Sequence, residues 1–155
     1  MRDRIERLMR TLLAPGELPT IVWVALTIAA VGIGVAGYLH GQLFWQGYSH
    51  VAVVGPLFIL AEIGSGVAII FLLLRRWILF VANALAISLG AVVSIFISHT
   101  SSFFGFAENA YGFRATTIVV AEIVAAVLCV VAAGLARREL GALVRGALVR
   151  EEPAR

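Results

Sequence analysis

The sequence has few charged residues, and this shortage excludes most water-soluble folds. Only 14% of the 155 residues are charged, 61% are hydrophobic, and the mean hydropathy is +1.00. A typical soluble domain has about 25% charged and 45–50% apolar residues. A body this small cannot hide so much apolar surface from water. The composition therefore indicates a polytopic membrane protein.

Other shortages remove further classes of protein. The single cysteine, Cys129, excludes a disulfide scaffold, and the high apolar content excludes an intrinsically disordered chain. The sequence has no nucleophile triad, no phosphate-binding loop and no cysteine pair. The spacing Gly32-x-Gly34-x-x-Gly37 fits a dinucleotide fingerprint, but it lies inside an apolar helical run and not after a strand. With Gly41, these glycines are expected to form a helix-packing face. We therefore expect no enzyme and no bound cofactor.

The remaining charges lie mostly at the two ends of the chain. Fifteen of the 21 charged residues fall in the first 17 and last 19 positions, so the 119 residues from Leu18 to Ala136 hold only six. Within that stretch, four runs are long enough to cross a bilayer as helices. The sequence predicts an all-α integral membrane four-helix bundle in a single domain, with spans near residues 20–40, 52–74, 77–98 and 115–136.

The arginines predict the orientation of this bundle. The chain has no lysine, and with four spans eleven of its twelve arginines fall on one side of the membrane, leaving only Arg114 on the other. The positive-inside rule then places both termini in the cytoplasm and the aromatic loops outside a cell's inner (plasma) membrane. The basic segments 1–13 and 137–150 are expected to be amphipathic and to associate with anionic lipid; nucleic acid is not expected as a partner.

The two halves of the sequence look alike. Ala-Glu-Ile at 61–63 recurs at 121–123, and both spans that carry it end in a pair of arginines. His40 stands 22 residues before the first of these glutamates, and His99 stands 23 residues before the second. These matches predict two parallel copies of one helical hairpin, related by a pseudo-two-fold axis along the membrane normal.

Glu62 and Glu122 are the only acidic residues inside the predicted spans. A charge at the centre of a spanning helix costs about 2.5–3.5 kcal/mol on insertion scales, so both are expected to face helix contacts. Histidines at helix ends and glutamates on the returning helices lean toward one another. We therefore expect the pairs His40 with Glu62 and His99 with Glu122, or one cluster of all four.

Such a set suits zinc or another divalent transition metal, or a proton relay, and His50 and Glu108 could join it from the loops. Three functional hypotheses stay open. The first is a non-enzymatic accessory or scaffolding subunit that packs with partner subunits or with copies of itself, its glutamates only holding helices together. The alternative is a transporter, channel or metal- or proton-handling protein. The second alternative is a haem b protein with His40 and His99 as axial ligands.

Overall fold

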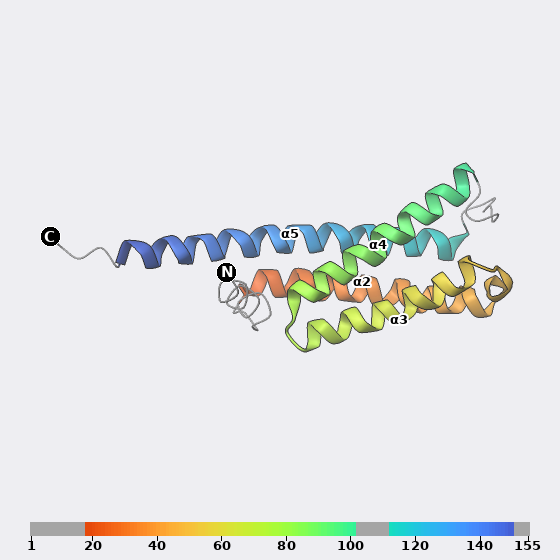
Figure 1. The fold of residues 1–155 in the computed structure, drawn as a ribbon, viewed down its shortest axis with the longest axis horizontal. Helices are drawn as coiled ribbons and strands as arrows, with labels where there is room; N and C mark the ends of the chain where they lie inside the picture. Colours follow the sequence, from red (N-terminus) through yellow and green to blue (C-terminus); the bar gives the residue numbers. More distant parts are fainter. Residues whose placement is uncertain (1–17, 102–111, 151–155) are drawn as a thin grey trace, which may run out of the picture.

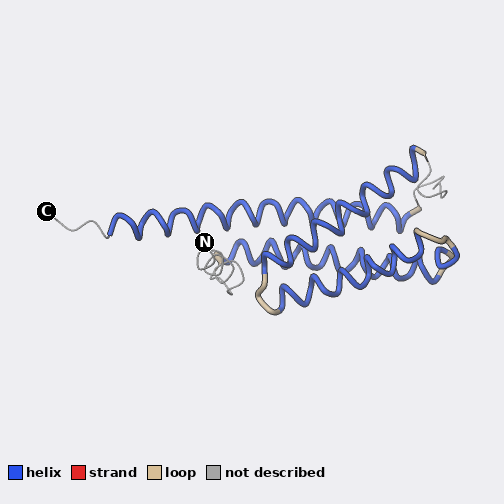
Figure 2. The backbone as a smooth tube through the Cα atoms, viewed as in Figure 1, coloured by secondary structure: helices blue, strands red, loops and turns tan. Residues whose placement is uncertain are grey.

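The protein is all-helical in the part of the chain that this computed structural model describes, residues 18–101 and 112–150 (Figure 2). The bounds of its elements are α2 Thr20–Trp45, the 3-10 turn η1 Tyr48–His50, α3 Val54–Leu73, α4 Trp77–Thr100 and α5 Phe113–Arg150. Each of the four long helices is long and apolar enough to span a membrane; in α5 this stretch is Phe113–Arg138. The prediction of four helices, each able to span a membrane, is confirmed, and the arrangement fits a multi-pass membrane protein.

The helices run alternately up and down (Figure 1). One end of the bundle carries the turn at Arg75 and Arg76, and we call it the arginine end. The other, where α2 and α4 end and α3 and α5 begin, we call the aromatic end. Helix α2 packs against α3 and α5, and α4 packs against the same two helices. Toward the aromatic end α4 diverges from α3 (Figure 1).

The core is formed by narrow stripes of residues spaced three and four apart, which is the spacing that keeps side chains on one helix face. On α5 the stripe comprises Ile118, Glu122, Ala125, Cys129, Ala132 and Ala136. On α2 it comprises Val22, Leu26, Ala29, Ile33, Ala36 and His40. Large apolar side chains on the other faces of all four helices remain exposed, as expected where lipid replaces water outside the bundle.

The glycines of α2 form the predicted packing face, and they serve two neighbouring helices. A Cβ atom at Gly32 would lie 3.0 Å from the carbonyl oxygen of Ala121 in α5. A Cβ atom at Gly37 would lie 2.5 Å from Cβ of Ser65 in α3. Because no real Cβ tolerates the latter distance, only glycine allows α2 and α3 to approach so closely there.

The observed helices differ from the predicted spans mainly at their ends. Helix α2 continues five residues past the predicted end. No residue before Gln46 breaks it, and the first residue with a non-helical positive φ is Gly47, at 146°. Helix α5 continues without interruption through 137–150, which we expected to be a separate amphipathic segment. This stretch lacks proline, and its four arginines, three leucines and two alanines, which favour helix, outnumber its two glycines. Segment 1–13 and residues 102–111, with Glu108, lie outside the described residues.

Candidate functional site

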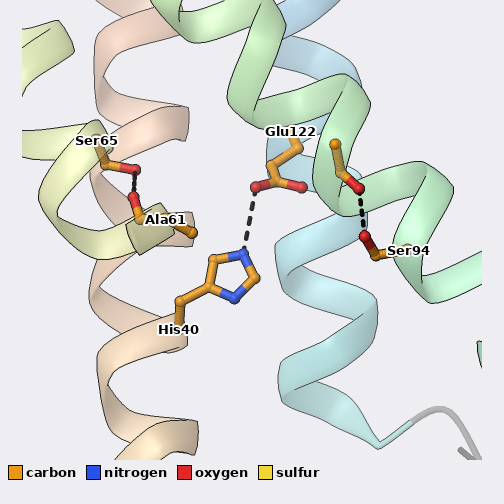
Figure 3. Close-up of polar contacts among 6 residues, drawn as sticks. His40, Ala61, Ser65, Ser94 and Glu122 are labelled. Carbon is orange, nitrogen blue, oxygen red and sulfur yellow. Dashed lines mark hydrogen bonds and ion pairs between the residues drawn. The ribbon is translucent and has the colours of Figure 1, made fainter. Parts of the chain in front are cut away.

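A buried polar contact joins α2 to α5. Nε2 of His40 lies 3.3 Å from Oε1 of Glu122, and the two groups share a hydrogen bond (Figure 3). The Glu122 side chain is 0% exposed and that of His40 is 7% exposed. Glu122 lies nine residues, about 14 Å, from the start of α5, and His40 lies about 8 Å from the end of α2. The pair therefore lies well inside the bundle, nearer its aromatic end.

Each side chain of the pair has a second polar atom that makes no hydrogen bond to the described residues. Among the described residues, no hydrogen-bond partner reaches Oε2 of Glu122 or Nδ1 of His40, although both atoms are buried. Buried polar atoms are nearly always hydrogen-bonded, since an unsatisfied one costs about 1–3 kcal/mol. The pair thus keeps capacity for a further hydrogen bond.

An aromatic cluster adjoins the pair. The ring centroids of His40 and Phe58 are 5.1 Å apart, and those of Phe58 and Tyr48 are 5.0 Å apart, both in tilted arrangements. Phe58 comes from the first turns of α3, and Tyr48 begins the short helix η1. Rings at this spacing attract one another, so they fix the position of the imidazole.

The pair and these rings line an open cavity of about 890 Å³, to which all four long helices contribute residues. On α4 the lining extends from Asn83 to Ser98, which is about 22 Å along the helix axis. Most lining residues are apolar. The cavity reaches the surface at the aromatic end, where exposed Arg114 lines it and donates a hydrogen bond from Nη1 to Oε1 of Gln46. Its size is typical of sites for drug-sized ligands.

The cavity also reaches the surface between α3 and α4. Leu60 on α3 and Gly90 on α4 both line it and are both exposed. Both residues lie in the halves of their helices nearer the aromatic end, and toward that end α4 diverges from α3 (Figure 1). One hydrogen bond still crosses the gap nearer the arginine end, from Nδ2 of Asn83 to the carbonyl oxygen of Gly64 at 3.3 Å. The cavity is therefore open to the side of the bundle as well as to its aromatic end.

The other predicted site residues lie elsewhere. Glu62 is exposed and does not line the cavity, although its carboxylate lies against α2, where a Cβ at Gly41 would be 2.5 Å from Oε2. His99 lies partly buried in the last turn of α4, and His50 is exposed in η1. Within residues 18–101 and 112–150, no three His, Cys, Asp or Glu side chains come together as a metal-binding group. The predicted cluster of four is therefore not assembled there.

The structure pairs His40 with the glutamate of the other hairpin, and not with Glu62 as we expected. The reason is the stripe of small residues on α5, where Ala125 and Ala132 are fully buried and let α2 approach closely. Sequence reasoning missed the cavity and the roles of Phe58 and Tyr48 beside it. The three-and-four spacing of Glu122 with the small residues of α5 was the available signal.

Searches of this chain against models of known protein families, curated proteins and solved structures find no match. Function must accordingly be inferred from the site itself.

Proposed function

We propose that the protein is a non-enzymatic, proton-handling membrane protein that binds a membrane-soluble molecule beside His40 and Glu122. The observation that supports this proposal most directly is the buried pair in the cavity wall, with one oxygen of Glu122 still unpartnered among the described residues. The proposal is a form of the proton-handling alternative drawn from the sequence. Its site has one histidine and one glutamate, in place of the predicted cluster of two histidines and two glutamates.

Electrostatics requires the buried pair of His40 and Glu122 to hold one proton. A lone carboxylate or imidazolium in a low-dielectric interior is strongly disfavoured, so the pair is stable either as two neutral groups or as a mutually compensating ion pair. Both arrangements hold one proton between His40 and Glu122. Any ligand that changes the charge beside Glu122 therefore changes where this proton resides, which couples binding in the cavity to proton uptake or release.

Infrared difference spectroscopy on the protein in lipid tests this proposal. Titration should reveal the carbonyl stretch of a buried carboxyl group, and Glu122→Gln should remove that band. Glu62→Gln is the matched control, because it makes the same change at the other membrane-embedded acid, which does not line the cavity. A titrating band that is unchanged in Glu122→Gln and is lost in Glu62→Gln would refute the proposal.

A second candidate, the accessory subunit or homo-oligomer, is favoured by one observation on α3. Glu62 is exposed eight residues into an apolar helix, beside exposed Ile63 and Gly66. Its carboxyl group lies against α2 on one side, and the side that remains exposed at that depth is stabilised if a further transmembrane segment covers it. Native mass spectrometry of the purified protein should then show a partner subunit or a second copy that is lost in Glu62→Ala. A stable lone monomer in mild detergent would contradict this candidate.

The haem hypothesis gains no support from His40. Its Nε2 atom, a usual iron ligand, is already bonded to Glu122. An absorption spectrum of the purified protein tests the hypothesis, since bound haem gives a Soret band.

A further inference from the structure

From the cavity geometry we infer the class of molecule it accepts: a hydrophobic organic cation, whose charge lies at Oε2 of Glu122 among the rings of His40, Phe58 and Tyr48. This inference rests on the proposed function and specifies its ligand. It uses the cavity, the buried carboxyl group and the aromatic cluster together.

The charge preference follows from the chemistry of the wall. Glu122 is the only acidic residue among the described residues that line the cavity; the other ionisable ones are His40, Tyr48 and Arg114. The unpartnered Oε2 of Glu122 accepts a donor or a positive charge. Aromatic faces attract cations as well, and Phe58 lies within 5.1 Å of both neighbouring rings. Carboxylate and rings thus favour the same sign of charge.

The only fixed positive charge in the described wall is remote from this position. Arg114 lies eight residues, about 12 Å along α5, from Glu122, at the exposed mouth of the cavity. Its guanidinium is hydrogen-bonded to Gln46. A cation that enters between α3 and α4 reaches Glu122 without passing this mouth, because that opening lies beside Leu60 and Gly90.

Binding exchanges one charge for another. When Glu122 holds the shared proton, a bound cation displaces that proton. The carboxylate is then ionised and paired with the cation, and the imidazole of His40 is neutral. One proton is released for each cation bound, so the net charge of the site does not change. The apolar remainder of the cavity then accommodates the hydrophobic body of the ligand.

Two probes of equal shape and opposite charge test the inference: tetraphenylphosphonium, a cation, and tetraphenylborate, an anion. Equilibrium dialysis against the protein in lipid nanodiscs, with empty nanodiscs subtracted, should show saturable binding of the cation and at least about tenfold weaker binding of the anion. A pH-sensitive dye in weak buffer should report proton release as the cation binds. Equal affinity for the two probes, or no saturable binding of the cation, would overturn the inference.

Two substitutions locate the site. Glu122→Gln should weaken cation binding at least about tenfold and leave the anion unaffected, whereas Glu62→Gln should change neither. If Glu122→Gln fails to fold, Phe58→Leu serves instead and should weaken cation binding about threefold. Cation binding that is unchanged in a folded Glu122→Gln protein would also overturn the inference. A titrating Glu122 band without charge selectivity would refute the cationic ligand alone, whereas the absence of a titrating Glu122 band from the unsubstituted protein would refute the proposed function.

Discussion

Replacing Gly37 by alanine should destabilise the bundle at a very close contact between α2 and α3. The added Cβ would lie 2.5 Å from Cβ and 2.7 Å from Oγ of Ser65, whereas non-bonded carbon atoms are at their optimum about 3.5–4.0 Å apart. Ser65 cannot easily turn away, because it is 3% exposed and its Oγ donates a 2.7 Å hydrogen bond to the carbonyl oxygen of Ala61. Helices α2 and α3 must therefore separate by about 1 Å at this level.

The magnitude follows from two opposing terms. Overpacking a tight contact costs about 1–3 kcal/mol, and two distances below 3 Å place Gly37 at the upper end of that range. Alanine gains about 0.8–1.0 kcal/mol over glycine in helix propensity. We expect a net loss of about 2 kcal/mol. Gly66→Ala is the matched control, because its added Cβ meets nothing within 4 Å beyond its chain neighbours and the nearby backbone of its own helix; it should be neutral or stabilise by up to about 1 kcal/mol.

Equilibrium unfolding in mixed micelles of mild detergent and dodecyl sulfate, followed by far-ultraviolet circular dichroism, measures both changes. Ser65→Gly removes the two clashing atoms, so the double variant with Gly37→Ala should recover most of the loss and give a coupling energy of about 2 kcal/mol. The reasoning is refuted if Gly37→Ala and Gly66→Ala shift the free energy of unfolding in the same direction, or if Ser65→Gly gives no rescue.

Three further predictions concern single groups. His40→Ala should lower the free energy of unfolding by about 1–3 kcal/mol in the same assay, because it leaves the buried Glu122 carboxyl without its hydrogen bond; an unchanged value would show that the pair contributes nothing to stability. Cys129, which is 0% exposed, should resist a maleimide reagent in mild detergent and react after denaturation, and rapid labelling of the native protein would contradict the buried stripe of α5. On a Cys129→Ala background, a membrane-impermeant maleimide should label Ser49→Cys but not Arg76→Cys in intact cells, and the reverse pattern would overturn the predicted orientation.

The sequence was sufficient to predict the four helices, because apolar length is a local property that the bilayer imposes on each segment separately. It also identified Glu62 and Glu122 as the unusual charges. It could not predict which helix meets which side chain. The lean of a side chain along its helix axis follows from the backbone, but the direction around the axis depends on which neighbours pack closest. For His40 that neighbour is α5, through its buried alanines.

The two Ala-Glu-Ile segments show how far identical local sequence can diverge in burial. Glu122 belongs to a continuous stripe of buried small residues and is 0% exposed, whereas α3 has only four buried residues and leaves Glu62 exposed. If the hairpins are copies, as 61–63 and 121–123 predict, the counterpart of the His40 contact with Glu122 would join α4 to α3. Helices α3 and α4 diverge toward the aromatic end (Figure 1), and residues of both line the cavity. On that hypothesis the open interface between α3 and α4 is where the predicted symmetry breaks, and the proposed ligand uses the space that it leaves beside Glu122, since a bundle with both contacts closed would have no side opening.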